Sequence, residues 1–84
     1  MVSSRMNLVE VGVEKDSVGN PATIIWSDGR RLSISSSGGA VLCPSRKPGK
    51  FAYVRDVYII GKGNKTYRRS LVADDGKWFI ESFK

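Results

Sequence analysis

Hydrophobic residues recur at every second position along much of the chain. Within Met6–Val13, Val9, Val11 and Val13 alternate with a glutamate and a glycine, which is the period of a β-strand with one buried face. The turn-forming residues of Lys15–Pro21 end this strand. No apolar period of 3.6 residues persists over three helical turns, so we expect strands rather than a long amphipathic helix.

The clearest local signal is Asp28–Gly29, which lies between two β-rich runs. Both residues tolerate positive φ, so the pair predicts a tight hairpin with a two-residue loop. In that register Trp26 lies opposite Arg31 on the more solvated face of the hairpin. The predicted core face consists of Thr23, Ile25, Leu32 and Ile34.

The second half of the chain repeats the same alternation of strands and turns. Ser35–Gly39 is a linker and Pro44–Lys50 an exposed loop, since its prolines and glycine disfavour both helix and central strand. Asp75–Gly76 predicts a second tight turn, and the simplest registers allow Asp56 to pair with Arg69. The strands predicted here are Ala40–Cys43, Phe51–Ile60, Lys65–Ala73 and Lys77–Phe83, with Gly61–Asn64 turning the second into the third.

Five or six short strands with regular turns predict an all-β fold. An open sheet of this size would leave one large face and two edges uncovered, so a closed barrel is favoured. We expect a small five- to six-stranded antiparallel barrel of the Src-homology-3-like kind, with an open oligonucleotide-binding-type barrel as the alternative. At 84 residues the chain holds one domain, expected over residues 6–84 after a flexible terminus over residues 1–5.

The composition argues against several classes of function. The chain has no histidine and a single cysteine, Cys43, so no intramolecular disulfide can form and no structural zinc site is expected. Its acids are scattered and no serine has a base, so we predict a non-enzymatic protein without a cofactor or a metal. The apolar runs fall far short of the roughly 20 residues that a membrane span needs, so we predict a cytoplasmic protein with no membrane partner.

The charge is unevenly distributed. The net charge is +6, and residues 46–69 contain eight basic residues and one acid, or +7, whereas the remainder has six basic and seven acidic residues, or −1. Such a region is expected for a polyanion partner, which by charge alone is a nucleic acid, an anionic lipid or an acidic protein. The alternative is solubility charge on solvated strand faces and loops. Exposed aromatic rings among the charges would stack on the unpaired bases of a nucleic acid. The candidate nucleic-acid-binding residues are Arg46, Lys47, Lys50, Arg55, Lys62, Lys65, Tyr67, Arg68 and Arg69.

Two hypotheses of function therefore stand side by side. The first is a binding module that contacts the nucleic acid backbone with little sequence selectivity. The second is a protein-interaction or accessory domain, homodimeric in one form, that uses a strand edge and the exposed pair Trp26 and Arg31. Because a small β domain needs aromatic residues for its core, we expect most of Phe51, Tyr53, Tyr58 and Tyr67 to be buried.

Three segments carry a resemblance to known sequences. They are PATIIWSDGRRLSI, VRDVYIIGKGNKTYRRSLV and DGKWFIES, and together they span roughly Pro21 to Glu81. This pattern resembles small uncharacterised proteins of Gram-positive bacteria with a similar aspartate-glycine-arginine hairpin and a similar C-terminal strand. The resemblance implies a compact β domain from a bacterium or a mobile element, and it implies no functional residue.

Overall fold

The computed structural model describes residues 8–82. Residues 1–5, the predicted flexible terminus, and Met6, which opens the first predicted strand, lie outside the described residues, as does Phe83. The elements are β1 (Leu8–Lys15), β2 (Pro21–Ile25), β3 (Arg31–Ser37), β4 (Val41–Pro44), β5 (Phe51–Ile60), the 3-10 turn η1 (Lys62–Asn64), β6 (Thr66–Asp74) and β7 (Lys77–Glu81).

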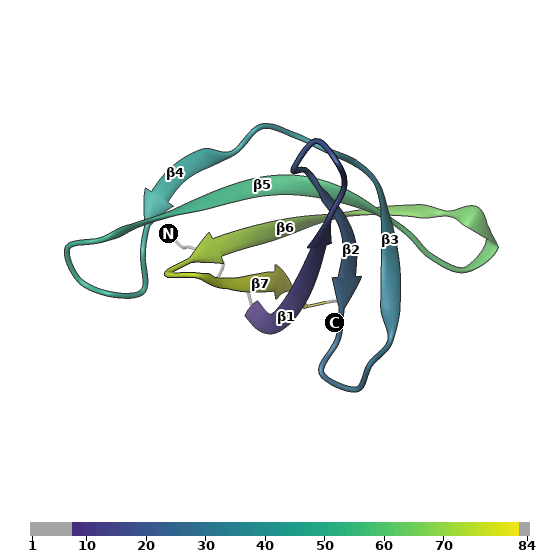
Figure 1. Ribbon diagram of the computed structural model, residues 1–84, viewed down its shortest axis with the longest axis horizontal. Coiled ribbons are helices and arrows are strands. Elements are labelled where there is room, and N and C mark those ends of the chain that lie inside the picture. The colour runs from purple at the N-terminus through teal and green to yellow at the C-terminus, as the bar shows by residue number, and fades with distance from the viewer. Residues whose placement is uncertain (1–7, 83–84) are drawn as a thin grey trace, which may run out of the picture.

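The strands form a closed antiparallel barrel (Figure 1). The hydrogen-bonded order is β3-β2-β1-β7-β6-β5-β4, and an additional pairing of β3 with β5 closes six strands into a ring. β5 is long enough to pair with β4 through its first half and with β3 through its second half. The small antiparallel barrel predicted from the sequence is therefore confirmed, and β4 is an extra strand outside the ring.

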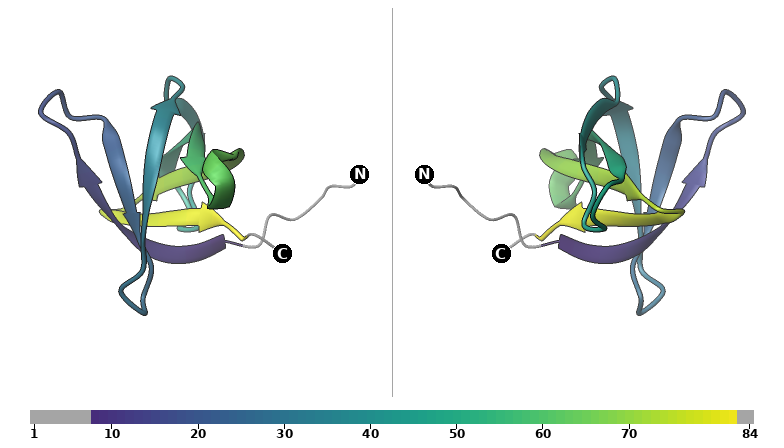
Figure 2. Two further views of the ribbon diagram at one scale, coloured as in Figure 1. Left: turned by 90° about the vertical axis from the view of Figure 1, so that its right-hand side faces the viewer. Right: turned by 90° about the vertical axis from the view of Figure 1, so that its left-hand side faces the viewer.

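The turns project from different ends of the barrel. Figure 2 shows the β1–β2 turn and the β2–β3 turn at opposite ends, as expected for consecutive antiparallel strands. The β4–β5 loop and the β5–β6 turn likewise lie at opposite ends of the long β5–β6 hairpin (Figure 1). Side chains from two turns can therefore meet only if both turns lie at the same end of the barrel.

No helix among residues 8–82 is long and apolar enough to cross a membrane.

The main core fills the barrel and is largely aliphatic. All six strands of the ring contribute to it, as expected for a barrel of this size, whose interior has room only for side chains. The buried members are Val11, Ile24, Val57, Ile59, Leu71 and Ile80, and the half-buried residues packed against them are Val13, Trp26, Leu32, Ile34 and Trp78.

A smaller cluster lies on the other face of the sheet. It consists of the buried residues Ala52, Val72 and Phe79, and the half-buried Cys43 packs against it. The thiol is thus part of an apolar cluster, in line with the short apolar strand predicted around it.

The β2–β3 hairpin has a different register from the predicted one. Trp26 N–H donates to Arg30 C=O at 2.8 Å and Gly29 N–H donates to Trp26 C=O at 2.9 Å, so three residues form the loop. Gly29 has φ of +92°, as the left-handed position of such a loop requires. Ile24 therefore pairs with Leu32, and Ile25 with Arg31.

This one-residue difference exchanges the two faces of β2, because side chains alternate along a strand. Ile24 is fully buried and Trp26 packs against the core. Thr23 and Ile25, which were predicted to face the core, are only half-buried on the opposite face. The predicted core residues of β3, Leu32 and Ile34, do pack against the core.

The β5–β6 turn is one residue shorter than the predicted turn Gly61–Asn64. Gly61 N–H donates to Lys65 C=O at 2.7 Å, which leaves a three-residue loop. Arg69 consequently lies opposite Val57, and Arg68, rather than Arg69, forms the ion pair with Asp56 at 3.6 Å.

The β6–β7 turn has the predicted two-residue loop. Asp74 pairs with Lys77, and Asp75 and Gly76 have φ of +54° and +79°. Positive φ at both central positions is the conformation for which aspartate-glycine is favoured. Leu71, Trp78 and Ile80 share one face in this register.

Candidate functional site

The basic residues of the central third do not form one continuous patch. Arg46, Lys47 and Lys50 lie in the β4–β5 loop, whereas Lys62 and Lys65 lie at the β5–β6 turn. Figure 1 shows these two places at opposite ends of the long hairpin. A ten-residue strand such as β5 separates them by roughly 30 Å at about 3.3 Å per residue. The predicted patch is thus two separate groups.

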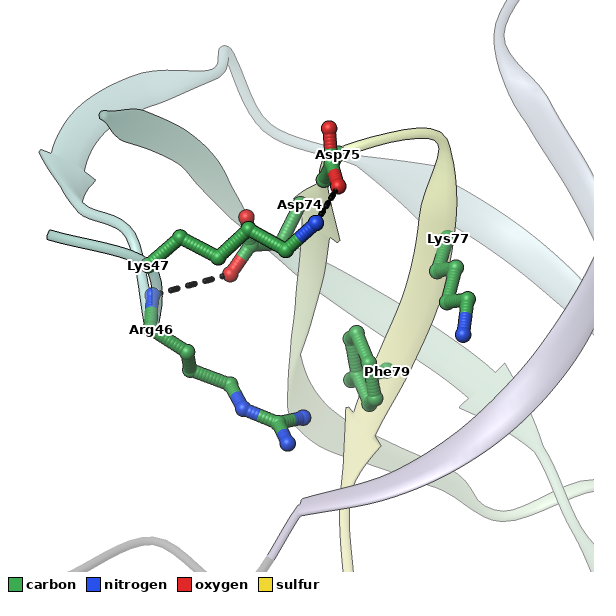
Figure 3. A pocket seen from close by; sticks show the side chains of 6 residues that line it. All are labelled: Arg46, Lys47, Asp74, Asp75, Lys77 and Phe79. Atoms are coloured by element: carbon green, nitrogen blue, oxygen red, sulfur yellow. Dashed lines mark hydrogen bonds and ion pairs between the residues drawn. The ribbon is translucent and has the colours of Figure 1, made fainter. Parts of the chain in front are cut away.

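The group in the β4–β5 loop is paired with acids of the β6–β7 turn (Figure 3). Asp74, which is buried, accepts hydrogen bonds from Ser45 Oγ at 2.6 Å and from Arg46 N–H at 3.1 Å. Asp75 forms ion pairs with Lys47 and, at 3.8 Å, with Lys50. These acids lie outside residues 46–69, so the local charge count did not include them.

The protonation of these groups follows from their partners. The Ser45 hydroxyl and then the Arg46 N–H hold the pKa of Asp74 below its ordinary value. The ion-paired hydrogen bond from Lys47 lowers the pKa of Asp75, and Asp75 in turn raises the pKa of Lys47. The contacts stabilise the charged forms, so much of the basic charge here serves to hold the loop.

The Arg46 guanidinium has a further partner in this cluster. It lies 4.8 Å from the centroid of the Phe79 ring, within cation–π range. Together with the acids, these side chains line a hollow of about 260 Å³. Two carboxylates in the lining make it a poor site for a polyanion.

Two other candidate residues lie between the ends of the hairpin. Arg55 is half-buried on β5, opposite Leu71. Arg68 is exposed and paired with Asp56. Neither lines the same hollow as Arg46 or as Lys62.

A larger groove opens at the end of the barrel where the β5–β6 turn lies. Its volume is about 650 Å³, within the usual range for ligand sites. The core residues Leu32 and Ile59 reach its lining, so it is the mouth of the barrel interior. Among residues 8–82, the lining consists of Val9, Trp26, Arg30, Leu32, Ile59, Gly61, Lys62, Tyr67, Arg69 and Ser82.

Two aromatic rings and three cations meet in this groove. Trp26 follows β2 and Tyr67 belongs to β6, which is three strands away in either direction around the six-stranded ring. The two rings therefore border the groove from opposite walls. Each has an arginine beside it: Arg30 lies 5.9 Å from the Trp26 centroid and Arg69 lies 6.0 Å from that of Tyr67. We call this site the cation–aromatic groove.

The electrostatics of the cation–aromatic groove differ from those of the β4–β5 loop. The described residues that line it include Arg30, Lys62 and Arg69 but no acidic residue. One acid is adjacent: Asp28 pairs with Arg30 Nε at 2.8 Å, and the backbone N–H of Arg30 lowers the pKa of Asp28. Lys65 adds a further exposed cation at the β5–β6 turn.

The predicted pair Trp26 and Arg31 is wrong as a pair. The three-residue loop places Arg31 opposite Ile25 on the outer face, where it forms an ion pair with Glu14. Trp26 lies on the inner face and is half-buried. Arg30, which sequence reasoning missed, takes the place beside Trp26. The sequence signal for Arg30 was that it faces Trp26 if the loop between the strands holds three residues, Ser27–Gly29.

The exposure of the aromatic residues also differs from expectation. Phe51, Tyr53, Tyr58 and Tyr67 are all exposed, by between 39% and 66%. Aliphatic side chains fill most of the barrel, so few rings are needed inside. Only Tyr67 among the four lines the cation–aromatic groove.

Within residues 8–82, no group of three or more histidine, cysteine, aspartate or glutamate side chains is arranged to hold a metal ion. Searches of protein-family models, curated proteins and solved structures returned no match to this chain.

Proposed function

We propose that this barrel is a non-enzymatic nucleic-acid-binding module and that the cation–aromatic groove is its binding site. The observation that carries the proposal is the meeting of Trp26 and Tyr67 with three cations in a groove that no acid among residues 8–82 lines. Phosphates bind the cations and unstacked bases bind the rings. Such binding tolerates different sequences, because every base has a flat face.

The proposed binding site lies at one end of the barrel and does not extend along the whole central third of the chain. Lys62 and Lys65 lie at that end, and Lys47 and Lys50 lie at the other, where Asp75 pairs with both. Charges without a nearby acid attract a polyanion more strongly than paired charges. The two lysine pairs therefore give a matched comparison.

The experiment measures binding of a fluorescent oligothymidine of about ten nucleotides by fluorescence anisotropy over a range of salt concentrations. The double variant Lys62→Gln/Lys65→Gln should bind roughly tenfold more weakly at low salt. Its plot of log K against log salt should be shallower by up to about 1.4, or 0.7 for each lost phosphate contact.

The control is Lys47→Gln/Lys50→Gln, which lowers the net charge by the same two units, from +6 to +4. It should bind almost as tightly as the unmodified protein. Equal losses in the two variants would mean that net charge alone drives association. No binding by the unmodified protein even at low salt would refute the proposal.

A second candidate function, self-association, is favoured by the outer edge of β4, which pairs with no strand of residues 8–82. The exposed apolar residues Val41 and Leu42 lie on this strand, beside Phe51 and Tyr53 of β5. β4 contains no charged residue to block edge pairing. Because Ser45 N–H donates to Lys50 C=O, the alternation of the ladder turns the backbone groups of Leu42 away from β5.

The partner that fits this edge is a second copy of the chain. In an antiparallel pair of β4 strands centred on Leu42, each Leu42 N–H meets the C=O of the other. Leu42 and Tyr53, which are paired neighbours, would then continue across the two-fold axis as one apolar row. The cation–aromatic groove is not part of this edge and would stay open in each copy.

A further inference from the structure

Gly61 has no conformational need to be glycine. It begins the β5–β6 turn with φ of −106° and ψ of −160°, an extended conformation that any residue adopts. Its N–H donates to Lys65 C=O at 2.7 Å, so the backbone is fixed in this place. The reason for glycine must therefore lie in what surrounds it.

The surroundings of Gly61 are the ring of Tyr67. A Cβ atom built at this position would lie 2.5 Å from Tyr67 Cε2 and 3.1 Å from Tyr67 Cδ2. Real atoms do not approach so closely, so any side chain here would displace the ring. The missing side chain allows the Tyr67 ring to lie directly against the backbone of the turn.

The result is a ring held in one place at the wall of the cation–aromatic groove. The Gly61 backbone supports one part of it, and the Arg69 guanidinium lies 6.0 Å from its centroid. The ring is nevertheless 39% exposed. A surface that is fixed before the ligand arrives loses little entropy on binding.

We infer that the cation–aromatic groove selects single-stranded nucleic acid by accepting an unpaired base beside Tyr67, and that Gly61 is the residue that positions this ring. In a duplex both faces of each base are covered by its neighbours, so the base cannot reach a ring on the protein. The groove, at about 650 Å³, suits a small ligand such as one nucleotide rather than a helix. This inference rests on the proposed function.

The test compares a single-stranded oligothymidine of about ten nucleotides with a blunt duplex of similar length, for Gly61→Ala and for Gly39→Ala. Gly39 is a matched control, because a Cβ there meets nothing within 4 Å and its φ lies outside the left-handed region. The unmodified protein should bind the single strand at least tenfold more tightly than the duplex. Gly61→Ala should lower single-strand affinity about five- to tenfold, as expected for a weakened base stack, and leave duplex affinity unchanged. Gly39→Ala should change neither.

A double-variant cycle separates positioning from a general structural effect. If Gly61 acts through the ring, adding Gly61→Ala to Tyr67→Ala should cause no further loss of single-strand affinity. A further loss of the same size as in the unmodified background would overturn the positioning role. A thermal transition for Gly61→Ala within a few degrees of the unmodified protein is expected, since the end of the Tyr67 ring can rotate away.

The outcomes distinguish the two proposals. Equal, salt-dependent affinities for single strand and duplex would leave the proposed function standing and overturn the selection of an unpaired base. Single-strand preference with an unaffected Gly61→Ala variant would overturn the role of Gly61. Binding to neither probe would overturn both.

Discussion

Ile24 and Ile25 are adjacent in the chain and face opposite sides of the barrel wall. Ile24 is 0% exposed inside the barrel, and Ile25 is half-buried on the outer face, near Gly12. Replacing either by valine removes one methylene group. At Ile24 the lost transfer free energy is about 0.8 kcal/mol, and the small cavity left behind brings the total to about 1 kcal/mol. At Ile25 the loss should stay below about 0.5 kcal/mol.

Thermal unfolding followed by far-ultraviolet circular dichroism measures this difference. For a domain of 84 residues, 1 kcal/mol corresponds to about 4–8 °C in Tm, so Ile24→Val should melt that much lower and Ile25→Val within about 3 °C of the unmodified protein. The pair tests the three-residue loop directly, because a two-residue loop would place Ile25 inside. A larger loss for Ile25→Val would refute the register and the inward position of Trp26.

Two further predictions concern the opposite end of the barrel. The pKa of Asp74 is lowered in the folded protein by Ser45 and Arg46, so its contribution to stability is complete above the unfolded pKa of about 3.9 and is lost as the pH falls through the lower folded value. Urea unfolding should therefore show that Asp74→Asn is less stable than the unmodified protein at pH 7. This difference in stability should shrink as the pH falls below about 4; a difference that does not change with pH would contradict the lowered pKa of Asp74. Sedimentation velocity should show concentration-dependent dimers that Leu42→Lys abolishes without lowering Tm, since a charge at the centre of the β4 edge opposes pairing; a concentration-independent monomer would rule out self-association.

The fold class followed from the sequence because strand alternation and turn residues are local signals. The turn at Asp75–Gly76 was predicted correctly, and both residues have positive φ there, whereas the same dipeptide at Asp28–Gly29 belongs to a three-residue loop in which only Gly29 has positive φ. The loop at Ser27–Gly29 holds one residue more than predicted, and the loop at Lys62–Asn64 holds one residue fewer. The composition of each loop is compatible with either length. The pairing of β3 with β5, which closes the barrel, joins segments that are distant in the chain, so no local pattern predicts it.

The site was partly predictable for the same reason. Lys62, Lys65 and Tyr67 are neighbours along one hairpin, so a local reading found them together. Trp26 joins them only because the barrel closes, which no local pattern reports. The charge of residues 46–69 overstates the positive charge that Lys47 and Lys50 offer to a ligand, because Asp75, more than twenty residues later in the chain, pairs with both.

The central claim is that nucleic acid binds at the mouth of the barrel. An NMR titration of the ¹⁵N-labelled protein with oligothymidine would locate the contact residue by residue. We predict shift changes at the Trp26 indole N–H and at the amides of Lys62 and Tyr67, with Lys47 and Asp75 unmoved. Changes centred on the β4–β5 loop, or spread evenly over all basic residues, would contradict the account.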